Sequence, residues 1–417
     1  MTAQWAERVL FSTLEGLKDA HLTIVMPGGE RREFGDARSD LRATIQVHQE
    51  RFFSRAVFGG DDGAGDAFVD GDWSSPDLVS VIRLGVRNIR HLEQGSKLQS
   101  WFSRMLNRLS HLRRANTLQG SRRNIAEHYD LSNDFFTLFL DENLLYSSAV
   151  FPSHDASLEQ AQIEKVDRLC RKLHLAPGDR VLEIGTGWGA FALHAVQHYG
   201  CEVTTTTISR QQHDYAAERF QRAGSDGRRI TLLFQDYREL QGQYDKIASI
   251  EMFEAVGFEN YDTFFSACDR LLAADGMMAM QTITMNEHHF AKYRQQGDWI
   301  QRRIFPGGEL ASLREVQNSL VRCTALSAAH IEDIGMHYAH TLAEWRSRFQ
   351  ASLTNVRGLG FDENFIRMWD YYLAYCEGAF RERYISAAQL VFAKLGTPRA
   401  IYGEPWNTRV LAGRASS

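Results

Sequence analysis

The feature of this sequence that most constrains its fold is a set of three glycines at alternate positions, Gly185, Gly187 and Gly189. They follow a short apolar run, 180–184, with an acidic residue near its end, and they precede a helix-forming segment, 190–198. This order predicts a strand, a tight turn and a helix. Glycine permits positive φ angles, and its missing side chain lets a ligand lie against the backbone. The stretch therefore predicts a ligand-binding turn at the end of a strand.

The glycine spacing argues against a dinucleotide as that ligand. Dinucleotide-binding turns read G-x-G-x-x-G, and an acidic residue about 20 positions further on binds the ribose. Here position 190 is alanine, and the next predicted strand, 202–207, ends in threonines without a carboxylate. The E-x-G-x-G-x-G form resembles motif I of the class I S-adenosylmethionine methyltransferases. An ordinary glycine-rich turn is the alternative, but the surrounding strand–helix–strand pattern favours the methyltransferase interpretation.

The segments around the glycines alternate between strands and helices, which predicts an α/β fold with a parallel, doubly wound sheet. Strands are expected near 181 and at 202–207, 230–234, 244–250, 276–283 and 385–393. Helices are expected at 157–173, 190–198, 210–223, 261–272, 310–321, 338–353 and 363–383.

The N-terminal part of the chain predicts a small α+β domain. Strands are expected at 22–26, 32–35 and 41–48, and a helix is expected to start at the Ser-Pro-Asp sequence of positions 75–77. The glycine-rich stretch 59–65 predicts a loop. With 417 residues the chain has room for a large domain beside this one. We expect an α+β domain at 1–95 with a lipid, membrane or dimer role, a basic helical linker at 96–124, a methyltransferase domain at 125–395 and a mobile tail at 396–417.

Charge and cysteine content exclude several classes of function. Lys and Arg number 47 against 52 Asp and Glu, a net charge of −5, so no global positive field suggests nucleic acid. The 5 cysteines show neither a C-x-x-C pair nor a zinc spacing, which predicts no metal site and a reducing compartment. The start of the chain lacks the apolar core of a signal peptide, and no apolar run reaches the ~18 residues of a membrane span. We expect a cytoplasmic protein, peripheral on the inner membrane face at most.

One segment differs strongly in charge from the rest. Between positions 83 and 123 the sequence has ten basic residues and one acidic residue, Glu93. Within it apolar residues recur at helical spacing, which predicts a basic amphipathic helix over 97–114, the type that lies on an anionic membrane surface. A linker helix that docks on the protein itself is an equal alternative, because an apolar stripe looks the same whichever apolar phase buries it.

Eight segments in order resemble the cyclopropane fatty acid synthase family, which includes the mycolic acid cyclopropane synthases and methyltransferases. They are 128–132, 146–149, 181–189, 207–212, 235–238, 252–257, 304–308 and 375–380, and the resemblance covers most of 123–393. It implies a class I methyltransferase fold with a helical insertion that covers the substrate. It also implies transfer of a methylene or methyl group from S-adenosylmethionine to the double bond of an unsaturated acyl chain in a phospholipid, forming a cyclopropane.

The resemblance also assigns the cofactor site, residue by residue. Tyr129, Tyr146 and Ser147 would close over S-adenosylmethionine, and the three glycines would line its methionine end. Thr207 and Gln212 would contact the ribose, and Gln235 and Asp236 the adenine. For Asp236 the alternative is the role of a turn residue. The implied partners are a phospholipid with an unsaturated chain, an anionic membrane surface and a second copy of the chain.

The predicted catalytic site departs from the family. In the family a bicarbonate ion removes a proton from the added methyl group, and a cysteine backbone, a glutamate, a histidine and a tyrosine hold it. Glu254 and Tyr338 match two of these residues, but Ser148 replaces the cysteine and Gln281 the histidine. A cationic partner for the anion is thereby lost.

These departures leave the product open. The sequence therefore keeps two alternatives to cyclopropane formation: a methyltransferase that gives a methyl-branched or methylene product, and a lipid-binding relative without turnover. Restoring the family residues at both positions is expected to preserve or raise the cyclopropane yield.

Overall fold

The computed structural model describes residues 3–94 and 132–397, which form two compact units that share the chain. The first unit contains residues 1–140, 285–309 and 335–386, and the second contains 141–284, 310–334 and 387–417. The units interleave, whereas the sequence predicts consecutive domains. The predicted basic linker at 96–124 and nearly all of the predicted tail at 396–417 lie outside the described residues, so the functional division of the chain stays a prediction.

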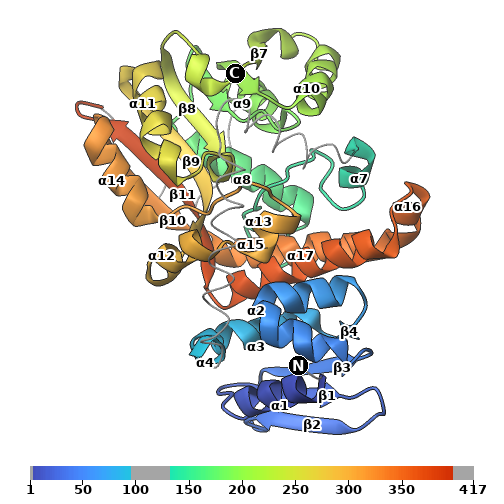
Figure 1. Ribbon diagram of the computed structural model, residues 1–417. Coiled ribbons are helices and arrows are strands. Elements are labelled where there is room, and N and C mark those ends of the chain that lie inside the picture. Colours follow the sequence, from blue (N-terminus) through green and yellow to red (C-terminus); the bar gives the residue numbers. More distant parts are fainter. Residues whose placement is uncertain (1–2, 95–131, 398–417) are drawn as a thin grey trace. The chain divides into compact units, whose positions relative to one another are not determined.

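A small mixed sheet opens the first unit (Figure 1). It contains β1 (His21–Val25), β2 (Arg31–Gly35), β3 (Arg42–Val47) and β4 (Trp73–Ser74), in the order β2-β1-β3-β4. Strand β1 pairs antiparallel with β2 and parallel with β3. The inward positions of β1 and β3, such as Leu22, Ile24 and Ile45, are buried, as the apolar alternation requires. The three strands predicted in this part of the chain are confirmed.

The helices of the first unit come from all three of its stretches. They are α1 (Ala3–Leu14), α2 (Arg51–Val69), α3 (Leu78–Arg87), α4 (Ile89–Gln94), α7 (Asn133–Thr137), α12 (Glu287–Gln296), α13 (Trp299–Arg303), α15 (Gly335–Ala351), α16 (Leu353–Gly358) and α17 (Glu363–Arg381). Helix α17 packs against α2, α3 and α15. As predicted, α3 starts after Asp77, whose side chain accepts the N–H of Ser80.

The loop predicted at 59–65 is wrong, because this stretch lies inside α2. Gly60, with φ 56° and ψ −139°, kinks the helix without ending it. Gly65 serves close packing: a Cβ atom there would lie 2.8 Å from the Trp299 ring and 2.9 Å from the Tyr371 ring. The glycines of α2 therefore allow a bend and a close approach of aromatic rings, which the sequence pattern alone does not distinguish from a loop.

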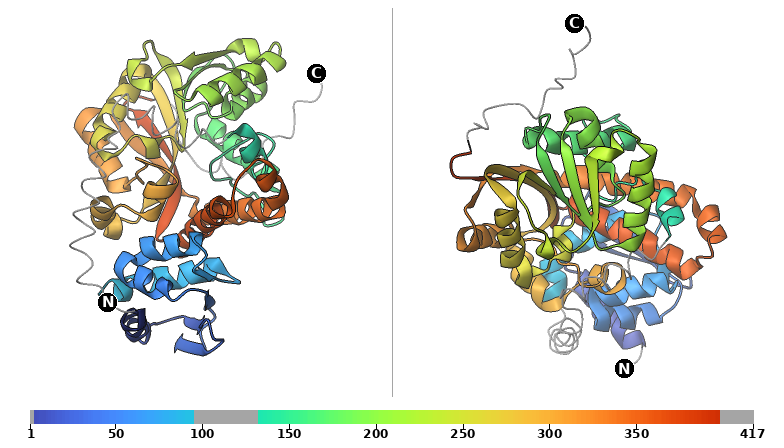
Figure 2. Two further views of the ribbon diagram at one scale, coloured as in Figure 1. Left: turned by 45° about the vertical axis from the view of Figure 1, so that its right-hand side comes forward. Right: turned by 90° about the horizontal axis from the view of Figure 1, so that it is seen from above.

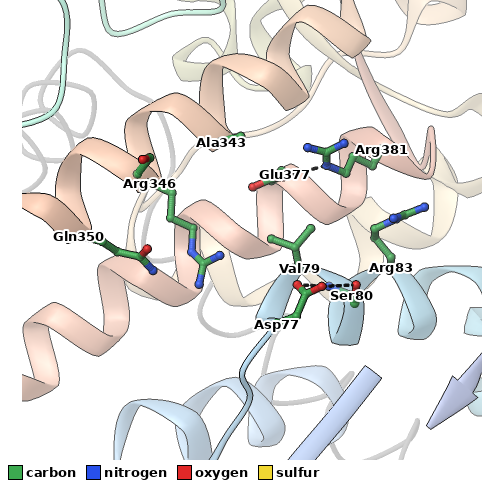
Figure 3. Close-up of a pocket in the computed structure, with 10 residues that line it drawn as sticks. Asp77, Val79, Ser80, Arg83, Ala343, Arg346, Gln350, Glu377 and Arg381 are labelled. Atoms are coloured by element: carbon green, nitrogen blue, oxygen red, sulfur yellow. Dashed lines mark hydrogen bonds and ion pairs between the residues drawn. The ribbon is translucent and has the colours of Figure 1, made fainter. Parts of the chain in front are cut away.

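A polar cavity lies between α3, α15 and α17 (Figure 3). Arg83, Arg346 and Arg381 line it, together with acidic and neutral polar residues. Each of these guanidinium groups lies 2.7 Å from a carboxylate oxygen, Arg83 from Glu382, Arg346 from Asp370 and Arg381 from Glu377. Their charge is thus already compensated within the unit.

The second unit is built on a seven-stranded sheet in the order β10-β11-β9-β8-β5-β6-β7. The strands are β5 (Arg180–Ile184), β6 (Glu202–Thr207), β7 (Ile230–Phe234), β8 (Tyr244–Ile250), β9 (Leu272–Met285), β10 (Leu326–Asp333) and β11 (Ile385–Lys394). The pairs β5–β6, β6–β7, β5–β8 and β8–β9 are parallel, and β10 is antiparallel to β11. The order changes direction at β5, so a crevice is expected at the carboxyl ends of β5 and β8.

Among the described residues, five α-helices cover this sheet, and Figures 1 and 2 show helices on its two faces. They are α8 (Leu158–Lys172), α9 (Ala190–Tyr199), α10 (Arg210–Arg222), α11 (Tyr261–Leu271) and α14 (Leu313–Cys323). Helix α8 begins with a capping box, in which Ser157 and Gln160 each accept a backbone N–H of the other. Within the described parts of the chain, no helix is both long and apolar enough to cross a bilayer.

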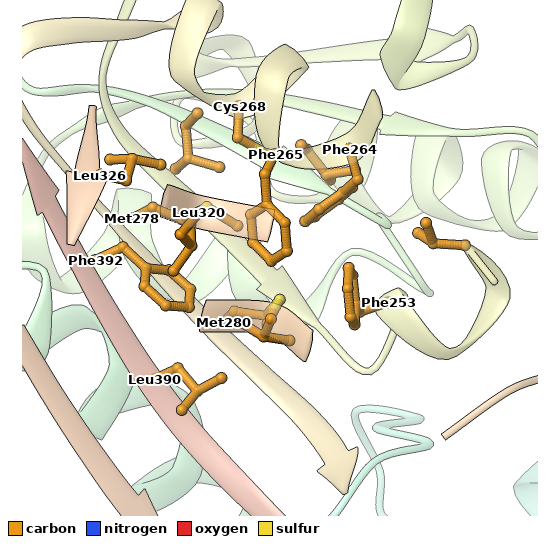
Figure 4. Packing of buried hydrophobic residues seen from close by; sticks show 14 of the residues in the cluster. Phe253, Phe264, Phe265, Cys268, Met278, Met280, Leu320, Leu326, Leu390 and Phe392 are labelled. Carbon is orange, nitrogen blue, oxygen red and sulfur yellow. The ribbon is translucent and has the colours of Figure 1, made fainter. Parts of the chain in front are cut away.

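The core of the second unit lies on both faces of the sheet. Neighbouring strand residues alternate between two clusters: Met278 and Met280 pack with α11 and α14, and Met277 and Ala279 pack with α8 and α9. Figure 4 shows the first cluster, in which Phe264 and Phe265 of α11 meet the methionines of β9. Strands that are apolar on both sides belong to a sheet covered on both faces. The predicted doubly wound α/β fold is confirmed.

Candidate active site

The glycine turn follows β5 as predicted, and each of its three glycines takes a positive φ angle. The φ angles are 101° at Gly185, 52° at Gly187 and 85° at Gly189. A Cβ atom would lie 3.0 Å from Met252 at Gly185 and 2.7 Å from Phe220 at Gly189, but at Gly187 it would meet nothing within 4 Å. Two glycines therefore permit close packing, while Gly187 borders open space that a ligand can enter.

Helix α9 begins directly after this turn. Its N-cap is Gly189, which has no side chain to satisfy the first N–H groups of the helix. Such N–H groups bind carboxylates and other anions. Open space at Gly187 and an uncapped helix start fit the methionine part of S-adenosylmethionine, which carries a carboxylate.

A buried acidic residue holds the turn in place. The carboxylate of Glu183 accepts the Thr205 hydroxyl at 2.6 Å, and Thr186 and Thr205 share a hydrogen bond of 2.7 Å. Burial raises the pKa of Glu183 to about 8, against the Thr205 hydrogen bond and the charge of Lys165. The backbone N–H groups of Gly185 and Thr186 donate to the Thr206 carbonyl. The turn is therefore fixed to β6 at several points.

The residues predicted to contact the ribose lie at the carboxyl end of β6. The Thr207 hydroxyl donates to the Gln212 side chain at 3.1 Å, and Gln212 stands in the first turn of α10. The structure thus brings the two together.

The residues predicted to contact the adenine lie at the end of the next strand, β7. The Asp236 carboxylate pairs with the Arg238 guanidinium at 2.7 Å and accepts its backbone N–H at the start of η2 (Tyr237–Glu239). Gln235 donates to the Glu239 carbonyl. Asp236 therefore has the turn role that the sequence left open, and its adenine contact stays a prediction.

Residues 141–151 lie beside this crevice and are tied to helix α8. The Gln162 side chain of α8 donates to the carbonyls of Leu145 and Ser147, and Lys165 donates to the Ser147 hydroxyl at 2.6 Å. Burial lowers the pKa of Lys165 to about 8, although nearby carboxylates, first Glu251, raise it. Tyr146 and Ser147 belong to this segment, whereas the predicted cofactor residue Tyr129 lies outside the described residues.

Glu254 lies beyond the end of β8, where its side chain turns toward β9. One carboxyl oxygen accepts the Thr282 hydroxyl at 2.9 Å and the Ile283 N–H. The other oxygen, Oε2, is shielded from solvent and has no hydrogen-bond partner among the described residues. Burial and then the charge of Glu251 raise the pKa of Glu254 above its usual range. Glu254 as a whole residue is only half-buried, but its carboxyl group is shielded from solvent and therefore favours the protonated form.

The two positions that depart from the family meet at a second carboxylate. Glu251 Oε1 accepts the backbone N–H of Ser148 at 2.8 Å and the Gln281 amide at 2.8 Å. Gln281 also donates to the Ser148 carbonyl and accepts the Gln389 amide, which in turn accepts from Lys172. Sequence reasoning missed Glu251, although an acidic residue directly after a buried parallel strand is itself a signal of a site.

Tyr338, the remaining catalytic candidate, belongs to the first unit. It lies on α15 and is buried, with its ring stacked on Phe380 at a centroid distance of 4.5 Å. Its part in the expected catalytic set stays a prediction. No group of three or more His, Cys, Asp or Glu residues suited to a metal ion occurs in the described parts of the chain.

Comparison with known proteins gives a consistent picture. A family model described as mycolic acid cyclopropane synthetase matches residues 116–390. The chain is 37% identical over 343 residues to the tuberculostearic acid methyltransferase UfaA1 of Mycobacterium tuberculosis, covering 81% of this chain and 79% of that protein. It is 37% identical over 358 residues to the cyclopropane-fatty-acyl-phospholipid synthase of Escherichia coli, covering 84% and 88%. The structure of mycolic acid cyclopropane synthase CmaA1 complexed with SAH and CTAB matches with a TM-score of 0.61 and 35% identity, over 66% of this chain and 98% of that one.

The doubly wound sheet and its glycine turn define a class I S-adenosylmethionine-dependent methyltransferase. Within that class the chain belongs to the mycolic acid cyclopropane synthetase family, and it is an enzyme of the cyclopropane-fatty-acyl-phospholipid synthase type. The family resemblance and S-adenosylmethionine as cofactor, both predicted from the sequence, are confirmed.

Proposed function

We propose that this enzyme methylates the double bond of an unsaturated acyl chain in a phospholipid and closes a cyclopropane ring. The observation that carries this proposal is the contact between the glycine turn and the segment after β8. A Cβ atom on Gly185 would lie 3.0 Å from the Cβ of Met252, and Glu251 and Glu254 stand on either side of that methionine in sequence. Groups able to accept a proton thus adjoin the cofactor turn.

The chemistry needs both parts of this arrangement. When bound, S-adenosylmethionine supplies an electrophilic methyl group, and an alkene is a weak nucleophile, so the protein must align the two and exclude water. Methyl transfer leaves a cation on the acyl chain. Loss of one proton from the added methyl then frees the electron pair of that C–H bond to form the last C–C bond of the ring. A carboxylate at the same crevice accepts that proton.

The methylene product is the second candidate. If a hydride first shifts from the methyl-bearing carbon to the neighbouring cation, the proton then leaves the added methyl group, the electron pair of that C–H bond forms an exocyclic double bond and no ring closes. Two observations favour this alternative: the neutral Gln281 at the predicted histidine position and the similarity to a tuberculostearic acid methyltransferase. Both candidates require the same cofactor site and one proton acceptor.

Lipid analysis separates the two candidates. The purified enzyme is incubated with methyl-labelled S-adenosylmethionine and vesicles of a mono-unsaturated phosphatidylglycerol, and the acyl chains are then analysed by mass spectrometry and proton NMR. We expect a gain of one CH₂ and high-field cyclopropyl signals. Olefinic methylene signals in their place would assign the second function. The reaction is repeated with free unsaturated fatty acid added to the vesicles. If the label then appears only in the free fatty acid, the phospholipid is not the substrate.

We also propose that the enzyme acts at the inner, cytoplasmic face of an anionic membrane. The support is the basic charge of 97–114, a segment outside the described residues. Replacing Arg104, Arg108, Arg113 and Arg114 by glutamine should weaken co-sedimentation with anionic vesicles by about 1 kcal/mol per charge. Added salt should weaken it as well. Vesicle binding that is unaffected by both changes would favour the linker alternative.

We also propose that the enzyme forms a homodimer, which sedimentation velocity tests.

A further inference from the structure

Glu251 is held in an unusual backbone conformation at the end of β8. Its φ angle is 48°, in the left-handed region that residues other than glycine rarely adopt. Its own N–H donates to the Gln281 carbonyl at 2.8 Å, so the position is fixed to β9. Strained residues of this kind cluster at functional sites, where the surrounding structure maintains them. The conformation therefore calls for a role of the side chain.

The side chain of Glu251 occupies two of the four groups that the family resemblance assigns to a bicarbonate ion, the Ser148 backbone and the Gln281 side chain. Its Oε1 accepts the Ser148 N–H and one N–H of the Gln281 amide, each at 2.8 Å. The second donor of that amide is bound to the Ser148 carbonyl at 3.1 Å, and its oxygen accepts from Gln389 at 2.9 Å. Gln281 thus has no donor left for a further anion, and bicarbonate does not fit this site.

The charges around Glu251 suit an ionised carboxylate. Lys165 of α8 is fully buried, and the charge of Glu251 is the main influence that raises the Lys165 pKa against burial. Glu254, on the other side, favours its protonated form, in part because of Glu251. Two neighbouring carboxyl groups at one site avoid carrying two negative charges. The pair therefore carries at most one negative charge, and the two N–H donors and the charge of Lys165 favour Glu251 as the group that holds it.

We propose that the Glu251 carboxylate is the proton acceptor of this enzyme and replaces the bicarbonate ion of the family. It takes a proton from the added methyl group, and the electron pair of that C–H bond forms the ring C–C bond, or the exocyclic double bond of the methylene product. The carboxylate becomes a carboxylic acid and later releases the proton to water. This inference rests on the proposed function, since it concerns the proton lost after methyl transfer.

The first test is the response of the wild type to bicarbonate. Product formation is measured in buffer freed of carbon dioxide, with and without added bicarbonate, on vesicles of a mono-unsaturated phosphatidylglycerol. We expect the two rates to differ by less than about two-fold. A fall of ten-fold or more without bicarbonate would overturn the proposal.

Two variants test the side chain itself. Glu251→Gly relieves the backbone strain and vacates the site, so product formation should fall by about 100-fold, the scale of a lost proton acceptor. Added bicarbonate or formate should then restore at least ten-fold. Glu251→Gln keeps the shape and the hydrogen bonds but accepts no proton, so it should lose activity without rescue. Wild-type rates in either variant in bicarbonate-free buffer would overturn the proposal.

Binding measurements distinguish a variant that has failed to fold from one that has lost only proton transfer. Both variants should bind S-adenosylmethionine like the wild type in calorimetry. Carbon-13 bicarbonate should show a bound NMR signal with the glycine variant and none with the wild type, and a bound signal with the wild type would count against the proposal. Glu202→Gln is the matched control, because Glu202 is an exposed residue at the opposite end of the sheet, and it should change neither rate nor binding.

Failure of the proposed function would be visible separately. If the wild type gives a methylene product, the cyclopropane assignment fails. The dependence of the rate on bicarbonate still tests the role of Glu251, because the methylene product also requires loss of one proton. If no methyl group reaches the phospholipid, the substrate assignment fails, and the carbon-13 measurement still tests whether Glu251 fills the anion site.

Discussion

Gly187 and Gly242 share a left-handed backbone and open surroundings, yet only Gly187 lies in the cofactor turn. Their φ angles are 52° and 103°, and a Cβ atom on either would meet nothing within 4 Å. Gly242 lies in the connection that precedes β8, at the amino end of the sheet. Substitutions at these two glycines distinguish two effects of an added side chain. Backbone strain is expected at both positions, whereas obstruction of the cofactor is expected only at Gly187.

The first prediction follows from this pair. Gly187→Val should abolish binding of S-adenosylmethionine, because the side chain would enter the space of the methionine part as well as strain the backbone. Gly242→Val should carry a comparable strain and keep the wild-type affinity. Calorimetry measures both. Equal loss of affinity in the two variants would show that strain alone explains the effect, and wild-type affinity in Gly187→Val would refute the position of the cofactor.

Much of the second unit is predictable from the sequence because its signals are local. The capping box at Ser157, the apolar strands and the glycine turn all lie within short windows of sequence. Strand β10 was not predicted, since four of its residues are exposed and its partner β11 lies about sixty positions later. Glu251 was missed for a similar reason: the Ser148 N–H that it accepts is 103 positions away, and only the fold brings them together.

The second prediction concerns Glu254. Glu254→Gln should reduce product formation by about 100-fold while it changes cofactor affinity by less than about three-fold. The reason is electrostatic. The shielded carboxyl group of Glu254 interacts with the charge of Glu251, so it influences which of these two carboxyl groups carries the negative charge. Initial rates and calorimetry on the same preparations measure the two effects. A parallel loss of both would make Glu254 a residue of the cofactor site and not of the proton transfer.

The third prediction concerns the pH dependence of stability. The pKa of Glu183 is about 8 in the folded enzyme and near 4.5 in the unfolded chain, so the folded state binds the extra proton between these values. The free energy of unfolding should therefore fall as pH rises from about 5 to 8, by up to about 1.4 kcal/mol per pH unit from this group. Glu183→Gln should remove that part of the slope in urea titrations. Glu202→Gln should retain it, and an unchanged slope in Glu183→Gln would contradict the assignment.

The last prediction reverses an expectation drawn from the sequence alone. From the sequence alone, Ser148→Cys and Gln281→His together are expected to preserve or raise the cyclopropane yield. In the structure the Gln281 amide bridges Glu251, Ser148 and Gln389, and a histidine ring has one N–H fewer and no carbonyl oxygen. Gln281→His alone should therefore lower product formation, by roughly ten-fold if one charge-assisted hydrogen bond of about 1.5 kcal/mol is lost.

A combined variant tests the same point in the opposite direction. Glu251→Gly, Ser148→Cys and Gln281→His together empty the carboxylate position and restore both family residues, so the product should form again and should require bicarbonate. The control is Glu251→Gly alone, whose rescue by bicarbonate should be weaker because Gln281 is neutral. A combined variant that is active in bicarbonate-free buffer would mean that neither Glu251 nor an external anion accepts the proton. The proton would then have to leave through another group at this crevice, and Glu254 is the nearest carboxyl group in sequence that touches the end of β9.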